Sequence, residues 1–259
     1  MKTQTIPTAD FYDLLQEVYN IFNTELFNKE LPNCLITVQR KNKVMGYFSS
    51  NRWIDEAGQK IHELALNPTY FTTCNFIEVF QTMVHEMCHL WQFEKGKPSR
   101  RSYHNKEWAR KMESIGLIPS STGKFGGKRT GQSMNDYPDK GGLFEKVCIQ
   151  LYKKGLFIKW FDRFPAVSHV DNVDISSSFG KDEDLHNFIE EDEIILQSLY
   201  TNVSEVITGT VSIKEMEMAV KQKQKTKYSC SGCESSLWGK PNLDIRCNAC
   251  QINFREVFY

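Results

Sequence analysis

The segment His85-Glu86-Met87-Cys88-His89 constrains the fold more than any other part of the sequence, because its spacing is useful only on a helix. At 3.6 residues per turn, residues four apart project from one face, so His85 and His89 can reach the same ion. Glu86 lies beside them and is close enough to accept a proton from a metal-bound water. The segment therefore predicts a helix with a metal site, and a metal-dependent hydrolase is the leading hypothesis.

The residues around this segment repeat with the period of an amphipathic helix. Asn75 and Glu78 predict a capping box at its start, and Gly96 with Pro98 predicts its end. The histidines should face away from the apolar stripe. That stripe consists of Phe76, Phe80, Met83, Val84, Met87, Leu90 and Trp91, and the opposite arc consists of Gln81, His85, His89 and Gln92.

A catalytic zinc ion usually takes three protein ligands and leaves one position for water. His104 follows His89 after fourteen intervening residues, which is enough for one helix to end and another to begin. We expect His104 to open that second helix, Gly116 to end it, and His104 to be the third ligand. Glu107 is the alternative, because a glutamate at this distance can also bind zinc.

The other histidines are weaker candidates for metal ligands. His62 lies in a predicted strand, Ile61–Leu66, where an exposed or packed histidine is the simplest interpretation. His169 and His186 lie in an acidic region without clear patterning, and we interpret them as surface residues.

Four cysteines near the end of the chain predict a second metal site. Two CxxC pairs are separated by thirteen residues, which is the spacing of a zinc ribbon. A segment of about 35 residues buries too little apolar surface to fold alone, so a structural zinc ion would supply the missing stability. The expected ligands are Cys230, Cys233, Cys247 and Cys250.

The remaining cysteines are isolated in apolar surroundings, and we interpret them as small buried hydrophobic residues. The two CxxC pairs, with the other thiols isolated, favour a reducing compartment, and we expect no signal peptide. We therefore expect a cytoplasmic protein. No apolar run is long enough to cross a membrane. These isolated cysteines are Cys34, Cys74, Cys88 and Cys148.

The order of motifs resembles the SprT-like zinc metallopeptidase domain. A helix comes first, followed by the strand-like segments LITVQ and MGYFS, then ELALNP, and finally HEMCHLWQ and HNKEW. The resemblance covers about residues 10 to 120, and the ribbon at the end of the chain strengthens it. It implies a catalytic zinc ion on His85, His89 and His104 with Glu86 as catalytic residue, besides the structural zinc ion. It also implies proteolysis linked to DNA and stress, typically of proteins crosslinked to or trapped on DNA.

The net charge of zero conceals a separation of charge along the chain. Residues 94–130 contain ten Lys or Arg against three Glu, whereas residues 171–193 contain nine acids against one Lys. The basic segment could bind a nucleic-acid backbone without sequence preference, although a solvated surface explains the charge alone equally well. On the ribbon, Trp238 and Lys240 could add a platform on which bases stack, although aromatic residues of ribbons more often pack. The candidate contacts are Arg100, Arg101, Lys124, Lys128, Arg129, Trp238 and Lys240.

The predicted fold class is α+β: a compact zincin-like metalloprotease domain with a small β-sheet and the HExxH helix, plus a small zinc ribbon. We expect a first helix at about 8–27 and strands near 35–39, 45–49 and 61–66. The predicted domains are residues 8–120 for the metallopeptidase domain, 121–165 for a basic Gly-rich loop and an aromatic segment packed on it, 166–227 for an acidic then basic linker, and 228–259 for the ribbon.

Together these features predict a zinc metalloendopeptidase that acts on protein substrates and associates with DNA or the nucleoid. The alternative is a zinc-ribbon DNA-binding or adaptor protein whose HExxH site is weak or vestigial. Proteolysis that depends on Glu86 separates the two hypotheses.

Overall fold

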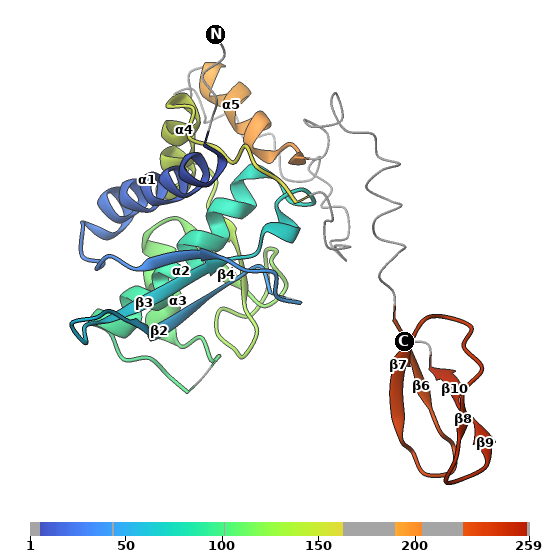
Figure 1. The fold of residues 1–259 in the computed structure, drawn as a ribbon. Coiled ribbons are helices and arrows are strands. Elements are labelled where there is room, and N and C mark those ends of the chain that lie inside the picture. Colours follow the sequence, from blue (N-terminus) through green and yellow to red (C-terminus); the bar gives the residue numbers. More distant parts are fainter. Residues whose placement is uncertain (1–5, 43, 101, 163–189, 204–224, 258–259) are drawn as a thin grey trace. The chain divides into compact units, whose positions relative to one another are not determined.

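In a computed structural model, the described residues of the protein form five α-helices and several small β-sheets (Figure 1). The fold is therefore mixed α and β. Within those residues, no helix is both long and apolar enough to span a membrane. The described ranges are 6–42, 44–100, 102–162, 190–203 and 225–257.

The chain divides into two units, Met1–Ile207 and Thr208–Tyr259. All five helices and the three-stranded sheet of residues 35–66 belong to the first unit, and the four clustered cysteines belong to the second, which has a three-stranded sheet of its own.

The first helix, α1 (Pro7–Phe27), confirms the amphipathic helix predicted at this position. It ends at Asn28, whose left-handed backbone (φ 53°) breaks the helical hydrogen bonding. Phe22 on its apolar face contacts Phe80 and Phe144, with ring centroids 5.8 and 5.9 Å apart. This contact joins three helices in one core.

The sheet of the first unit contains β1 (Leu35–Val38), β2 (Gly46–Ile54) and β3 (Lys60–Leu66) in the order β1-β3-β2. The central strand β3 runs parallel to β1 and antiparallel to β2, so β2 is an edge strand. At Gly46 the backbone of β2 lies close to the helix that contains Thr82. A Cβ at this position would meet Thr82 Cγ2 at 2.7 Å, so only glycine fits there without a shift.

The strand β2 extends beyond the predicted residues 45–49 because its register shifts between Ser49 and Trp53. At this bulge the backbone N–H of Asn51 donates to His62 Nδ1 at 2.9 Å. His62 Nε2 lies 3.0 Å from Glu94 Oε1. His62 is thus a packed residue, as predicted, and it connects the bulge to the following helix.

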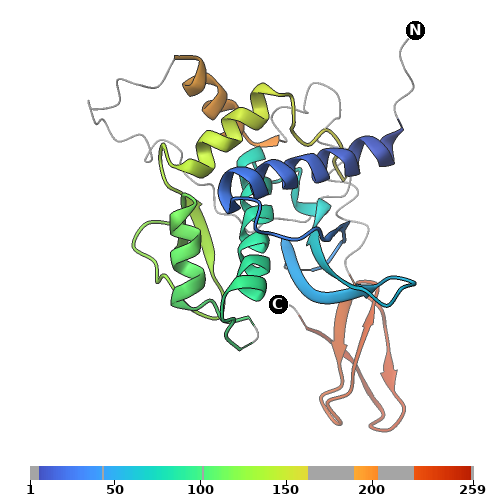
Figure 2. The same cartoon turned by 90° about the vertical axis from the view of Figure 1, so that its left-hand side faces the viewer.

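The helix that carries the HExxH segment, α2 (Phe76–Lys95), begins with the predicted capping box between Asn75 and Glu78. It lies between the three-stranded sheet on one side and α3 (Lys106–Ser114) on the other (Figure 2). Its predicted polar arc is therefore largely covered: Gln92 is buried, because α3 packs against that side.

A hairpin of two short strands, β4 (Leu117–Ser120) and β5 (Asn135–Pro138), follows α3 and was not predicted from the sequence. The loop between the strands returns at Gly131, which pairs with His104 through two backbone hydrogen bonds of 2.8 and 3.1 Å. The hairpin thus contacts the segment that leads into α3.

The helices α4 (Leu143–Lys153) and α5 (Glu190–Tyr200) pack on each other. The Tyr200 hydroxyl donates to Glu145 at 2.5 Å. Residues 190–203 fall within the segment 166–227 that the sequence suggested as a linker, yet Ile195, Leu199 and Val203 join the core of the first unit. Most of the acidic stretch 171–193 lies outside the described residues.

The second unit is built of short strands around Tyr228, which is fully buried. Its hydroxyl accepts from the Leu243 backbone N–H at 2.9 Å and lies 2.6 Å from the Lys240 carbonyl oxygen. The strands form sheets of order β10-β6-β7 and β8-β9. They are β6 (Thr226–Ser229), β7 (Ser236–Gly239), β8 (Arg246–Cys247), β9 (Ile252–Asn253) and β10 (Arg255–Val257).

Candidate metal centres

Three imidazoles converge in the first unit. The ligand nitrogens of His85, His89 and His104 all lie within 4.8 Å of one another, and His89 Nε2 lies 3.1 Å from His104 Nε2. Nitrogen ligands of a tetrahedral zinc ion, at about 2.0–2.1 Å from the metal, lie about 3.3 Å apart. The spacing and the donor type therefore fit zinc.

His104 reaches the cluster from a position that differs from the predicted one. It precedes α3, which begins at Lys106 after the N-cap residue Asn105, instead of opening that helix. Its Nδ1 lies 3.3 Å from the carbonyl oxygen of Gly131 and can donate a hydrogen bond to it. The other ring nitrogen, Nε2, then faces His89. The bridge to the hairpin, not a helix, orients this imidazole.

Glu107, the alternative third ligand, is not part of the cluster. Its Oε2 accepts hydrogen bonds from Gln92 Nε2 at 2.8 Å and from the Lys97 backbone N–H at 2.7 Å. These two bonds, the one to Lys97 first, lower the pKa of Glu107. Glu107 thus holds the connection between α2 and α3.

We expect His104→Ala to lower the zinc content of the purified protein by about one equivalent, because it removes one of three converging ligands. Glu107→Ala should leave the zinc content unchanged. Metal analysis by atomic emission checks both variants, and the opposite result would make Glu107 the ligand.

Trp108 on α3 packs against all three imidazoles. Its ring stacks on His89 at 5.3 Å between centroids and meets His104 edge-on at 4.4 Å. The side chain is fully buried, so it closes one side of the cluster to water.

Asp136 on β5 is a site residue that the sequence did not reveal. Its Oδ2 lies 2.8 Å from His85 Nδ1, which leaves His85 Nε2 free for a metal. Gln81 on α2 donates to the Asp136 carbonyl oxygen at 2.7 Å and holds the strand in place. The other carboxylate oxygen, Oδ1, is buried and has no hydrogen-bond partner among the described residues.

The imidazoles and the neighbouring carboxyl have shifted pKa values. Burial and the charge of His85 lower the pKa of His104 to about 4, and burial also lowers the pKa of His89. For His85, burial acts to lower the pKa, but the hydrogen bond and charge of Asp136 outweigh it and raise the pKa. Burial raises the pKa of Glu86. His89 and His104 are therefore neutral near pH 7, which is the form that binds metals.

We expect Asp136→Asn to weaken zinc binding at the histidine cluster about 10- to 100-fold, because it removes the carboxylate that orients His85. Competition with a chelator of known affinity measures the effect. Asp139→Asn is the matched control, since Asp139 is exposed on the same segment. Equal affinities of the two variants would contradict the positioning role.

The four ribbon cysteines form the second cluster. Their sulfur atoms all lie within 4.8 Å of one another, and Cys233 Sγ is 3.7 Å from Cys247 Sγ. Sulfur ligands at about 2.3 Å from a tetrahedral zinc ion lie about 3.8 Å apart. Hydrogen bonds to Ser235 lower the pKa of Cys233 to about 6, which favours the thiolate. The cluster is compatible with zinc.

The four other cysteines are all buried and free, as predicted, and none belongs to either cluster. The histidines His169 and His186 lie outside the described residues.

The predicted nucleic-acid contacts differ in their surroundings. Lys124 and Lys128 are exposed, whereas Arg129 Nη1 lies 2.8 Å from Glu113 Oε1 in an ion pair. Arg100 lies over the ring of Tyr103, and Arg101 lies outside the described residues. In the second unit, Trp238 and Lys240 are exposed.

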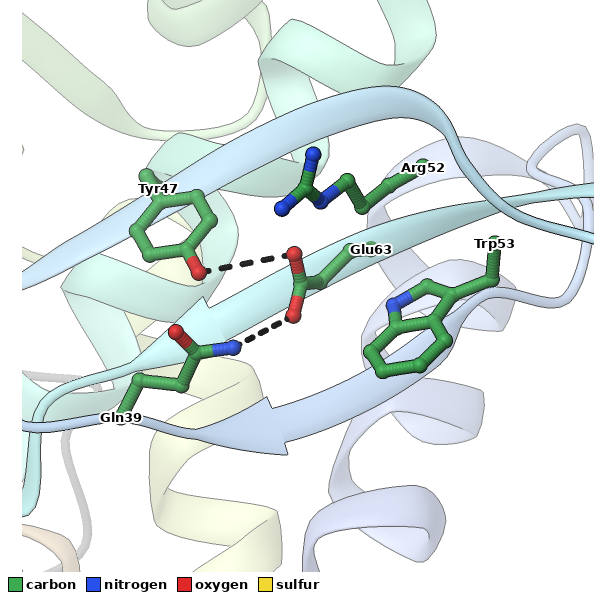
Figure 3. A pocket seen from close by; sticks show the side chains of 5 residues that line it. All are labelled: Gln39, Tyr47, Arg52, Trp53 and Glu63. Carbon is green, nitrogen blue, oxygen red and sulfur yellow. Dashed lines mark hydrogen bonds between the residues drawn. The ribbon is translucent and has the colours of Figure 1, made fainter.

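A separate pocket of about 300 Å³ lies on the sheet (Figure 3). The carboxylate of Glu63, a buried residue, forms part of its lining and accepts from Gln39 Nε2 at 2.7 Å and Thr37 Oγ1 at 2.8 Å. Trp53 and Arg52 form part of the lining as well. None of these side chains belongs to the histidine cluster, and no sequence motif singled them out.

The histidine cluster of the mixed α/β unit and the cysteine cluster of the second unit define a protein with two candidate metal sites. A family model described as the SprT-like family matches residues 15–124, which include the sheet and all three histidines of the cluster. A relative from Salmonella typhimurium, described as "Uncharacterized protein in mucB 3'region", is 45% identical over 60 residues, which are 23% of this chain and 81% of that protein. No solved structure matches the chain. The chain belongs to the SprT-like family, and this membership suggests a metallopeptidase-type protein.

Proposed function

We propose that the protein is a zinc-dependent metalloendopeptidase with a zincin-like catalytic domain and a structural zinc ribbon at residues 228–259. The convergence of His85, His89 and His104 beside the buried carboxyl of Glu86 carries this proposal. In this assignment the three histidines hold the catalytic zinc ion. Cys230, Cys233, Cys247 and Cys250 hold the structural one.

Glu86 is the catalytic base of the proposed reaction. When bound, zinc supplies Lewis-acid polarisation of the scissile carbonyl and increases the acidity of water. Because burial raises the pKa of Glu86, its carboxylate is a stronger proton acceptor than an exposed glutamate. It takes a proton from the attacking water and later delivers it to the leaving amine. Trp108 excludes water from one side of the site.

The edge strand β2 is the proposed binding site for the substrate peptide. Glu86 accepts a hydrogen bond from the backbone of Phe48 in this strand, so the base and the sheet edge are adjacent. An extended peptide can pair with an unpaired edge strand through main-chain hydrogen bonds, which do not depend on its sequence. This supports hydrolysis of exposed, extended segments of protein substrates.

We further propose that the enzyme associates with DNA in the cytoplasm or nucleoid and acts on proteins crosslinked to or trapped on DNA. The basic segment 94–130 supports this, since ten cations against three acids favour an anionic polymer. Lys124 and Lys128 on this segment are exposed to solvent.

A cleavage assay on a protein crosslinked to an oligonucleotide tests the proposal. The zinc-loaded protein should cleave the crosslinked substrate, lose activity with a chelator and regain it with zinc. Cleavage of the crosslinked substrate no faster than of the same protein without DNA would leave a general peptidase. Binding of DNA without any cleavage would favour an adaptor with a vestigial site.

A further inference from the structure

We propose that Phe125, together with Lys124 and Lys128, is a contact for single-stranded nucleic acid, in which the phenyl ring stacks on a base and the lysines neutralise phosphates. The inference deepens the proposed association with DNA and rests on it. Phe125 was not among the contacts predicted from sequence, which in this loop were the cations Lys124, Lys128 and Arg129.

The exposure of Phe125 is the first observation. Its side chain is 92% exposed, the largest exposed fraction among the large hydrophobic side chains of the described residues. Covering a phenyl ring that is surrounded by water lowers the free energy, and this ring makes no contribution to the core. The ring is therefore available to a partner.

The loop presents this ring in a defined backbone conformation. Ser121 and Lys128 close the loop: the Ser121 N–H donates to the Lys128 carbonyl oxygen at 2.9 Å, and the Lys128 N–H donates to Ser121 Oγ at 3.0 Å. Ser120 Oγ donates to the Lys124 carbonyl oxygen at 2.6 Å. Gly127 packs so closely that a Cβ there would collide with the Ser120 hydroxyl. Such a closed loop loses little backbone entropy when it binds.

The charges around the ring select an anionic partner. No acidic residue occurs between Ser114 and Ser133, whereas Lys124, Lys128 and Arg129 do. Arg129 pairs with Glu113, but no described acidic side chain forms an ion pair with Lys124 or Lys128. One aromatic ring close to two such cations combines stacking with phosphate neutralisation, the two interactions that bind single strands without sequence preference.

A membrane surface fits this loop less well. Phe125 is flanked by Lys124 and by two glycines, Gly126 and Gly127, so a single phenyl ring would have to anchor the loop in lipid. Interfacial binding normally requires an apolar face of several residues. A base, in contrast, needs only one exposed ring on which to stack.

The contact would lie on the same hairpin that holds the histidine cluster. Gly131, at the end of the loop, pairs with His104, and Asp136 on β5 binds His85. A strand bound at Phe125 would thus be held by the element that positions two of the three candidate ligands.

Fluorescence anisotropy of the full-length zinc-loaded protein with a labelled single-stranded DNA oligonucleotide tests the inference. We expect Phe125→Ala to weaken binding about tenfold, Phe125→Leu to weaken it similarly, and Phe125→Trp to retain it, because a base stacks on an aromatic ring and not on an aliphatic chain. Tyr12→Ala, which removes an exposed aromatic ring from α1, is the control and should bind DNA as tightly as the wild-type protein. Since Phe125 is exposed, the melting temperature should not change in these variants.

The lysines have a separate readout. For single strands, log affinity falls with log salt with a slope of about 0.7 for each phosphate that the protein neutralises, so replacing both Lys124 and Lys128 by Ala should reduce the slope by about 1.4. Lys146→Ala, which removes an exposed lysine from α4, should leave the slope unchanged.

Three results would overturn the inference: wild-type DNA affinity of Phe125→Ala, full DNA binding by Phe125→Leu, or a Phe125→Ala variant that binds phosphatidylserine vesicles more weakly but DNA normally. Failure of the proposed peptidase activity is a different result, since binding is measured without cleavage. If the variants bind normally while the wild-type protein cleaves crosslinked substrates, the proposed function stands and Phe125 has no part in it.

Discussion

Replacement of Glu86 by Gln should reduce proteolysis at least a hundredfold while zinc remains bound to the histidine cluster. The substitution keeps the shape of the side chain and removes the proton acceptor, and general-base catalysis contributes about 10²- to 10⁴-fold. Glu86 is not among the converging ligands, so the amide should not displace the metal. Cleavage rate and zinc content, measured on the same preparation, separate loss of the base from loss of the site.

The control for this variant is Glu17→Gln, which makes the same change at a position on α1 away from the histidine cluster. It should cleave at the wild-type rate. If Glu86→Gln cleaves within about threefold of the wild-type protein, Glu86 is not the base. If it loses zinc instead, the carboxylate is needed for the metal site and the assignment of its role is wrong.

The central helix could be predicted from the sequence because its signals are local. The capping box at Asn75 and Glu78, the apolar period and the HExxH spacing all act within one helix, and the structure has each of them. The ribbon cysteines were predictable for a similar reason, since each CxxC pair brings two thiolates together through a single turn.

The hairpin β4–β5 could not be predicted, because its strands lack the usual signals. Each has four residues, and each includes a proline, Pro119 or Pro138, which is ordinarily evidence against a strand. The sequence therefore did not identify Asp136 as the partner of His85, which lies 51 residues away in the chain. A contact between distant segments depends on tertiary packing that a single sequence does not reveal.

The helix α5 illustrates the opposite problem. Its acidic start, Glu190 to Glu193, matches the composition of a solvated segment and predicts part of a linker. Burial of Ile195 and Leu199 against α4 shows that a few well-placed apolar residues outweigh local charge.

The two candidate metal sites should differ in what they contribute to stability. The histidine cluster is embedded in a unit with a large apolar core, which includes Phe22, Phe80 and Trp108. Among the described residues of the second unit, only Tyr228, Cys230 and Cys247 are buried hydrophobic residues, and two of these are candidate ligands. We therefore expect the first unit to fold without metal and the second to require it.

Removal of zinc from the ribbon, by Cys247→Ser or by a chelator, should consequently unfold the second unit and leave the first folded. A structural zinc ion contributes about 10–16 kcal/mol to a small domain, which is comparable to the whole stability of an ordinary one. Hydrogen exchange should then show unprotected amides across residues 226–257 and retained protection in α1 and α2.

His89→Ala is the matched control for this experiment, because it removes a ligand from the other cluster. It should lose one zinc ion but keep the ribbon amides protected, and the Cys247→Ser variant should keep the zinc at the histidines. Protection of the ribbon after its zinc is removed would mean that the few apolar contacts around Tyr228 suffice to fold it, and the metal would then have a role other than stability.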